Sequence, residues 1–188
     1  MLVARSPPEP VTPSDCQAAD MRDVAFRIIY DEDFGYVVNT LRRLGVRERD
    51  VEDIAHEVFV AVHRHLEAYD PSRPRRAWLF GFAVRCAAAH RRRAQHVREQ
   101  VTDVEPVDAG PRADELVATD QARRLVLLGL EALDDTRRAI FVMHEIDGYR
   151  MPEVAEALGI PLNTGYSRLR LARREFTAAV REAQRRDR

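Results

Sequence analysis

The stretch PEVAEALGIPLNTGYSRLRLARR, residues 152–174, decides the fold of the C-terminal third of the chain. Pro152 suits the first position of a helix, and Gly159 is placed to end that helix after an apolar inner face. A tight turn, Ile-Pro-Leu, then leads to a second helix capped by Asn163 or Thr164. Two short helices joined by a glycine-containing turn are typical of a helix-turn-helix, whose second helix enters the DNA major groove.

The second helix divides into two faces when it is projected at about 100° per residue. Its core face is predicted to consist of Tyr166, Leu169, Ala172 and Phe176. Its outer face has hydrogen-bonding side chains near the N-terminus and arginines further along, as base and phosphate contacts require. Contacts with duplex DNA are therefore predicted for Asn163, Thr164, Ser167, Arg168, Arg170 and Arg174. A solvated arginine face on a structural helix is the plainer alternative.

Gly165 is the one residue of this helix that the pattern does not explain. A glycine inside a helix costs about 1 kcal/mol relative to alanine. It either permits the close approach of a neighbouring backbone or is simply tolerated.

Helical periodicity also fills the N-terminal half of the chain. Apolar residues recur at helical spacing over 34–44, where Gly45 stops the helix, and again over 50–68. A proline-containing loop is predicted at 69–77 and a third helix at 78–93. No alternating strand pattern of useful length occurs. The predicted fold class is all-α, with two small helical domains joined by a flexible acidic linker.

Charge is segregated along the chain, although the formal net charge is only −1. Residues 34–98 and 121–188 each contain 13 arginines, against 7 and 10 acids respectively. Residues 1–33 contain 7 acids and 3 arginines, and residues 99–120 contain 7 acids and 1 arginine. Two basic blocks separated by acidic segments indicate two modules with an anionic partner. The predicted divisions are a largely disordered N-terminal extension (1–33), a first domain (34–98), a linker (99–120) and a helix-turn-helix domain (121–183).

The composition and the two cysteines limit the cellular compartments in which the protein is expected. No run approaches the roughly 18 apolar residues of a membrane span, and the N-terminus lacks the apolar core of a secretory signal. Cys16 and Cys86 are far apart and have no metal-ligand spacing, which fits a reducing compartment. We expect a cytoplasmic protein.

The sequence contains no pattern typical of an enzyme. His56, His63 and His65 lie at offsets of 7 and 2, so they do not share a helix face as a metal-binding pair at i and i+4 would. A glycine-rich phosphate loop, a paired-cysteine motif and an activated nucleophile are all lacking from the sequence. We therefore expect neither catalysis nor a metal or other cofactor.

Both modules resemble extracytoplasmic-function (ECF) sigma factors of bacterial RNA polymerase. RDVEDIAHEVF (49–59) and AWLFGFA (77–83) resemble region 2 of that family. Residues 133–176, which include Gly159-Ile160-Pro161 and Ser167-Arg168-Leu169, resemble region 4. The resemblance extends over about 34–96 and 121–180, in the order of the family.

The resemblance implies a transcription initiation factor with core RNA polymerase and promoter DNA as partners. Region 2 would melt the −10 element, and region 4 would read the −35 element as duplex; an anti-sigma factor is a further partner that the resemblance allows. Polymerase docking is implied for Asp53, His56 and Glu57. Contacts with the unpaired −10 strand, which needs aromatic surfaces and arginines, are implied for Arg73, Arg75, Arg76, Trp78, Arg85, Arg91 and Arg92. Trp78 has a strong alternative interpretation as a core residue beside Leu79 and Phe82.

The chain departs from the family pattern at several positions. His56 replaces the usual glutamine, and Asp134 replaces a usual proline. Val84 and Ala89 stand where many relatives have arginine and aspartate, so contacts assigned to those positions are in doubt. The alternative function is a helix-turn-helix regulator that acts without polymerase docking. That function would not explain the acidic face around Asp53 or the flexible linker.

Overall fold

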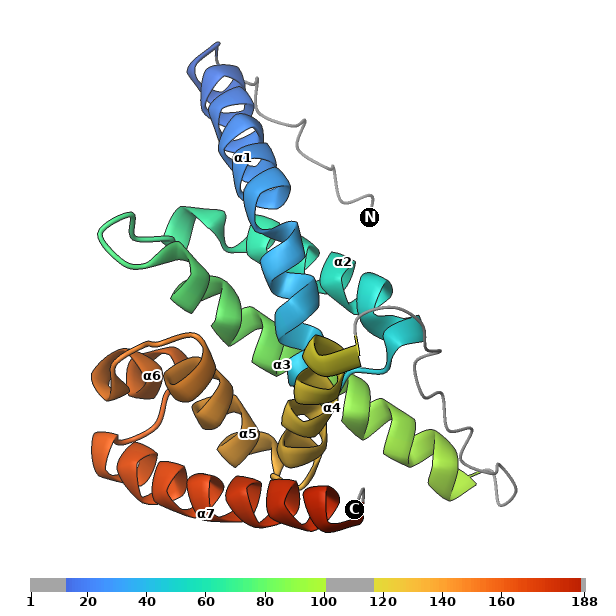
Figure 1. The fold of residues 1–188 in the computed structure, drawn as a ribbon. Helices are drawn as coiled ribbons and strands as arrows, with labels where there is room; N and C mark the ends of the chain where they lie inside the picture. Colours follow the sequence, from blue (N-terminus) through green and yellow to red (C-terminus); the bar gives the residue numbers. More distant parts are fainter. Residues whose placement is uncertain (1–12, 101–116, 187–188) are drawn as a thin grey trace, which may run out of the picture.

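The computed structural model describes residues 13–100 and 117–186, and Figure 1 shows that these residues form helices and short turns. No strand occurs within those ranges, so the all-α prediction is confirmed. The elements in chain order are α1 (Pro13–Arg43), α2 (Glu48–Arg64), the short helix η1 (Leu66–Ala68), α3 (Arg75–Gln100), α4 (Val117–Glu131), α5 (Asp135–Phe141), the π-helical turn η2 (Val142–Ile146), α6 (Met151–Leu158) and α7 (Leu162–Arg186).

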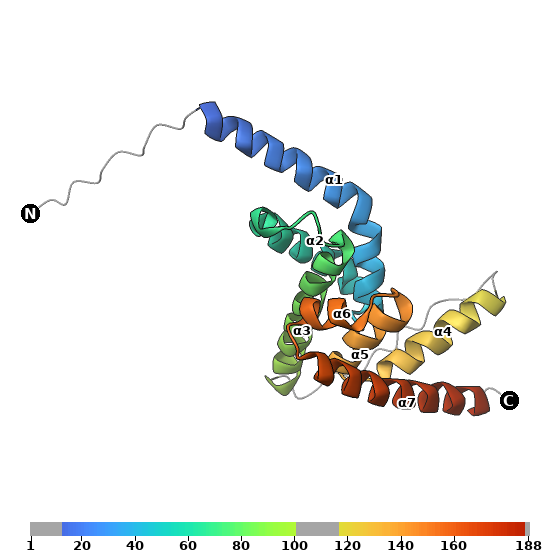
Figure 2. The same cartoon turned by 90° about the vertical axis from the view of Figure 1, so that its left-hand side faces the viewer.

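Helices α1, α2 and α3 pack together as the N-terminal module. The apolar stripe predicted for the second helix is buried in α2, with Val58 and Val62 fully inaccessible. Leu41 of α1 and Phe80 of α3 are buried against it. Gly45 has a φ of 84°, so it ends α1 in the left-handed conformation that the sequence predicts. The first turns of α1 project beyond the other helices (Figure 2).

Helices α4 to α7 form the C-terminal module, in which α6 and α7 are the predicted helix-turn-helix. Gly159 caps α6 with a φ of 63°, and Leu169 and Ala172 of α7 are buried as predicted. The prediction for Tyr166 is wrong, because 53% of this residue is exposed. The packed face of α7 is centred on the line through Gly165, Leu169 and Ala172, and Tyr166 lies about 100° away from it.

Gly165 is buried because α6 approaches α7 at this point. A Cβ added to Gly165 would lie 2.6 Å from Sδ of Met151, the first residue of α6, and Met151 is itself only 2% exposed. A side chain here would have to displace the buried Met151 side chain from the contact between the two helices of the helix-turn-helix. Gly165 therefore allows α6 to pack closely against α7, and this close packing explains why a residue with poor helix propensity stands here.

Replacing Gly165 with valine should destabilise the protein by about 2 kcal/mol, because overpacking a filled core costs this much. Gly35→Val is the matched control, since a Cβ at Gly35 in α1 meets nothing within 4 Å. The control should leave the midpoint of urea denaturation unchanged or raise it slightly. Equal destabilisation by the two variants would contradict the packing role of Gly165.

Several helix boundaries differ from the sequence prediction. Helix α1 is continuous from residue 13 to residue 43, so it joins the described part of the predicted N-terminal extension to the first predicted helix of the N-terminal module. Helix α2 begins at Glu48 rather than at Asp50. Helix α3 begins at Arg75, because the carbonyl of Pro74 already accepts bonds from the first turn, and this shortens the predicted loop at 69–77. Helices α3 and α4 also extend into the predicted linker, whose residues 101–116 lie outside the described ranges.

The two modules are in contact with each other. Helix α6 packs on α3, as Figures 1 and 2 both show, and the end of α1 lies beside the start of α5. None of the helices in the described ranges is long and apolar enough to cross a bilayer.

Candidate nucleic-acid interface

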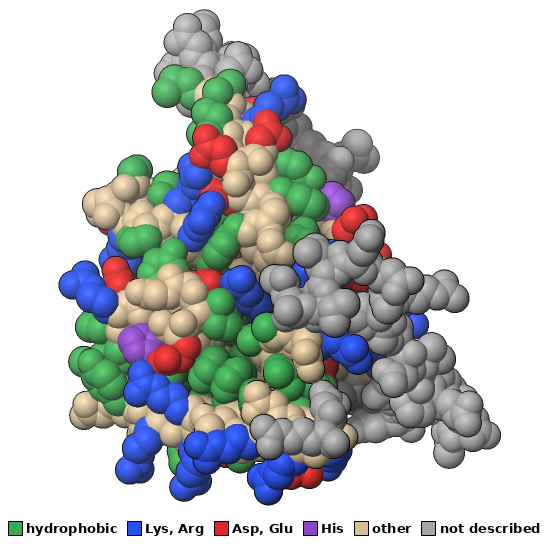
Figure 3. Space-filling view, viewed as in Figure 1, with side chains coloured by type: hydrophobic (Ala, Val, Ile, Leu, Met, Phe, Trp, Pro, Cys, Tyr) green, Lys and Arg blue, Asp and Glu red, His purple; other side chains and the backbone are tan. Residues whose placement is uncertain are grey.

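The outer face of α7 presents the residues predicted to contact duplex DNA. Asn163, Ser167, Arg170 and Arg174 are exposed, and Thr164 and Arg168 are half-buried at its margins. Figure 3 shows arginine side chains along the edge of the molecule that α7 forms. The exposed Ser167 hydroxyl donates to the Thr164 carbonyl at 3.0 Å. The predicted face therefore exists as one continuous polar and cationic surface.

Three of the residues predicted to contact the −10 strand lie on one side of α3. Trp78, Arg85 and Arg92 are spaced by seven residues, so they lie nearly in line along the helix. Trp78 is half-buried, and its ring lies 4.8 Å from that of Tyr69 and 5.0 Å from that of Phe82. The Arg85 guanidinium lies 4.5 Å above the Phe82 ring, within cation–π range. The Trp78 ring is thus packed against two aromatic neighbours but remains partly accessible.

The arginines at the start of α3 are held by acids of α1. Arg75 and Arg76 form ion pairs with the buried carboxylate of Asp33 at 2.6 Å and 3.0 Å. The hydrogen bond from Arg75 to Glu32 raises the pKa of Arg75, and the charge of Asp33 adds to this rise. These contacts fix the two guanidinium groups relative to the helix, and sequence patterns could not show this, because the paired residues are more than 40 positions apart.

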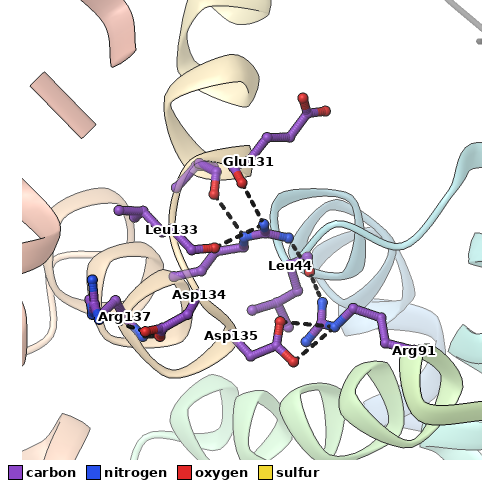
Figure 4. Close-up of polar contacts among 9 residues, drawn as sticks. Leu44, Arg91, Glu131, Leu133, Asp134, Asp135 and Arg137 are labelled. Carbon is purple, nitrogen blue, oxygen red and sulfur yellow. Dashed lines mark hydrogen bonds and ion pairs between the residues drawn. The ribbon is translucent and has the colours of Figure 1, made fainter. Parts of the chain in front are cut away.

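Arg91 does not join the other predicted −10 residues. Figure 4 shows its guanidinium directed toward Asp135 of the C-terminal module, with which it pairs at 3.0 Å, and it also donates to the Leu44 carbonyl just after α1. Arg92, one position later and about 100° further round the helix, is exposed. The structure therefore separates Arg91 from the line formed by Trp78, Arg85 and Arg92.

Asp53, His56 and Glu57 lie on one exposed face of α2, as their spacing requires. The Tyr30 hydroxyl lies 3.3 Å from Nε2 of His56, and Arg93 pairs with Glu57 at 2.8 Å. Beside this face is an open groove of about 270 Å³, which sequence reasoning missed. The residues that line the groove are Phe26, Tyr30, His56, Phe59, Val60, His63 and Arg64.

The guanidinium of Arg138 joins the ends of two helices. It donates to the carbonyls of Leu130 at 2.8 Å, Glu131 at 3.2 Å and Leu133 at 3.1 Å, at the C-terminus of α4. It also donates to the Leu44 carbonyl at 3.1 Å, just after α1. Helix C-termini leave such carbonyls without partners and favour cations. Burial lowers the pKa of Arg138, and the nearby charge of Arg91 adds to this effect.

Asp147 forms a second connection between the modules. Its carboxylate accepts hydrogen bonds from the Tyr36 hydroxyl and from Arg43, both at 3.0 Å, and its side chain is 8% exposed. Burial raises the pKa of Asp147, and the bond from Tyr36 and the charge of Arg43 oppose that rise. Burial and the charge of Asp147 likewise raise the pKa of Tyr36.

Comparison with known proteins assigns each of the two modules to a protein family. The family model described as Sigma-70 region 2 matches residues 29–97, and the model described as Sigma-70, region 4 matches residues 123–176. The RNA polymerase sigma factor CnrH of Cupriavidus metallidurans is 30% identical over 175 residues, which cover 87% of this chain and 91% of CnrH. The chain belongs to the ECF sigma factors.

Other relatives agree with this sigma factor assignment. The ECF RNA polymerase sigma-E factor of Escherichia coli K12 is 26% identical, over 73% of this chain and 77% of that protein. The solved structure of CnrH in complex with the cytosolic domain of CnrY superposes with a TM-score of 0.60 at 28% identity, covering 87% of this chain and 92% of CnrH. RpoE of Bartonella quintana, solved with the anti-sigma factor NepR, has a TM-score of 0.66 at 16% identity, over 84% and 97% of the two chains, and shares the fold.

Membership of the sigma factor family assigns a function to the chain that contains the helix-turn-helix. Sigma factors direct RNA polymerase to promoters, so the chain is a transcription initiation factor and not an enzyme. The region 2 match contains α2 and almost all of α3, and the region 4 match contains the whole of α6 and the exposed polar face of α7. Within the described residues, no group of three histidine, cysteine or acidic side chains could hold a metal ion.

Proposed function

We propose that the N-terminal module docks on core RNA polymerase and holds the melted −10 strand, while α7 reads the −35 element as duplex. The observation that carries this proposal is the continuous outer face of α7, from Asn163 to Arg174, set on a buried helix-turn-helix. Hydrogen-bonding groups stand at the tip of α7, where base edges would be, and arginines follow where guanine or phosphate would be.

The proposed docking face is Asp53, His56 and Glu57 of α2, where His56 can still form the hydrogen bond of a glutamine. The proposed −10 surface is the line of Trp78, Arg85 and Arg92, which combines an accessible aromatic ring with cations, as an unpaired strand needs. Arg73, Arg75, Arg76 and Arg91 lie off this line and are proposed to contact the strand's phosphates.

We assign the two modules to residues 34–98 and 121–183, with residues 99–120 as the tether. A tether leaves each module weak on DNA alone, and it raises their joint affinity once polymerase fixes their separation. The site of action is proposed to be the cytoplasm, where polymerase meets the chromosome. An anti-sigma factor is a proposed further partner, because both solved relatives are bound to a second protein.

Replacing Arg170 with alanine should reduce promoter use about tenfold, because one good contact with a base is worth about 1–3 kcal/mol. Arg181→Ala is the matched control, since Arg181 is exposed on α7 about three turns further along. Transcription from a set of promoters that differ at single −35 positions measures the effect. A loss confined to some sequences identifies a base contact, whereas no loss on any promoter would contradict the assignment of this face.

The second candidate function, a regulator that binds promoters without polymerase, uses the same face of α7. It leaves the region 2 module without a role, and nothing in the geometry favours it. Co-purification with core polymerase separates the two functions.

A further inference from the structure

Two large apolar side chains are exposed at the start of α7. Leu162 is 42% exposed and Tyr166 is 53% exposed, and they stand about one helical turn apart on the same side of the helix. The rotation of α7 is fixed at Gly165, because the buried Met151 side chain of α6 fills the space in front of that residue. Tyr166 follows Gly165 by one position and lies about 100° further round the helix, off its packed side. The contact that buries Gly165 therefore exposes Tyr166.

Tyr166 lies within the outer face of α7, between two residues that are proposed to read bases. Asn163 stands three residues before it and Arg170 four residues after it, and both are exposed. From Leu162 to Arg174 the helix contains four arginines and no acidic residue. The aromatic ring is thus set among cations and hydrogen-bonding groups. Such a surface suits a nucleic acid better than an apolar partner protein.

The major groove offers one apolar group to an exposed aromatic ring, the 5-methyl group of thymine. This methyl group lies beside the O4 acceptor at the edge of an A·T pair, and apolar side chains contact it directly. Adenine, guanine and cytosine carry no methyl group there and are read through hydrogen bonds. The ring of Tyr166 therefore favours thymine at the base pair that it faces.

The spacing along α7 places this thymine relative to a guanine. Arg170 stands four residues after Tyr166, which is about 6 Å along the helix axis, or roughly two base pairs of duplex at 3.4 Å each. Arginine pairs best with guanine, through its O6 and N7 atoms. The two bases are therefore expected within about two base pairs of each other.

We propose that Tyr166 is a specificity-determining residue, whose ring packs on the methyl group of a thymine in the −35 element. This inference rests on the proposed function, because it uses the −35 assignment of α7, and it adds the identity of one base in that element. Leu162, one turn earlier, extends the same apolar edge of the helix. The contact is made by ring carbons, so it does not require the tyrosine hydroxyl.

The test removes the thymine methyl group and nothing else. A promoter is first selected by transcription with core polymerase and the full-length chain, from templates with a randomised −35 region. Each thymine of the selected −35 element is then replaced by deoxyuridine, which pairs in the same way but lacks the methyl group. At one position the replacement should weaken promoter binding by the wild-type holoenzyme about fourfold, the ratio expected for the burial of one methyl group.

Four variants show whether the methyl effect depends on the ring. Tyr166→Ala should bind the thymine and deoxyuridine promoters equally at that position, whereas Tyr166→Phe should keep the fourfold difference because the ring remains. Arg170→Ala should lose discrimination at a different base pair and keep the methyl effect. Thr177→Ala is the matched control and should behave as wild type, since Thr177 is exposed on α7 about three turns beyond Tyr166.

Each outcome either supports the assignment of Tyr166 or overturns it. A selected element without thymine, no methyl effect in the wild type, or a methyl effect that persists in Tyr166→Ala would overturn it. An equal loss by Tyr166→Ala on every promoter, with weaker binding to core polymerase, would overturn it in favour of a protein contact. If the alanine variant does not fold, Tyr166→Gln gives the same decision, because glutamine favours the helix but has no ring. Failure of the proposed function is seen separately, as wild-type transcription that does not depend on the −35 sequence.

Discussion

Replacing Arg138 with methionine should lower the free energy of unfolding by about 3 kcal/mol. The guanidinium donates to four carbonyls at the ends of α4 and α1. The Leu44 carbonyl also accepts from Arg91, and the Leu130 carbonyl accepts from the Leu133 N–H, so these two keep a partner in the variant. The Leu133 carbonyl, in a residue that is 3% exposed, loses its charged donor and keeps its desolvation cost. Methionine fills similar space but donates no hydrogen bond, so the loss isolates the polar contribution.

Arg137→Met is the matched control for this prediction. Arg137 is the preceding residue of α5, and its partners are the carboxylates of Asp134 and Glu175 at the surface. Such partly exposed ion pairs contribute at most about 1 kcal/mol. Urea denaturation followed by circular dichroism compares the two variants. Equal decreases in the free energy of unfolding would mean that Arg138 contributes no more than a surface arginine. The hydrogen bonds from Arg138 to the helix ends would then add no stability of their own.

Reversing the charge of the docking face should abolish most polymerase binding. Asp53→Arg is expected to weaken the complex with core polymerase about 100-fold, because a like charge brought into a complementary interface costs several kcal/mol. Asp53 is exposed on α2, so the fold should not change. DNA contacts made by α7 should remain intact.

The control for this charge reversal is Glu67→Arg, at an acid that is 80% exposed beyond the end of α2. Biolayer interferometry with immobilised core polymerase measures both affinities. If Asp53→Arg binds as well as Glu67→Arg, the polymerase docks on another surface, and the groove beside His56 is the next region to test.

The sequence was sufficient for the features that depend on local patterns. The helix-turn-helix, its glycine cap at residue 159 and the buried stripe of α2 follow from residue spacing within single helices, and all three are confirmed. Tyr166 was placed wrongly because the direction of the core face depends on how closely α6 approaches Gly165. A projection of one helix contains no information about its neighbour.

The contacts between modules could not be predicted, because their partners are far apart in the sequence. Tyr36 and Asp147 are separated by 111 positions, and Arg138 and Leu44 by 94. Charge segregation indicated two basic modules but gave no reason for them to pair with each other. Asp135 and Glu156, which pair with Arg91 and Arg73 of the N-terminal module, lie inside the basic C-terminal block, so the net charge of that block does not reveal them.

Run-off transcription with bacterial core polymerase on a library of genomic fragments shows whether this chain directs RNA polymerase to promoters through its two modules. Discrete start sites should appear only when the chain is added, and they should disappear with Asp53→Arg. A chain that binds duplex promoter DNA unaided, yet never supports initiation with core polymerase, would contradict this function.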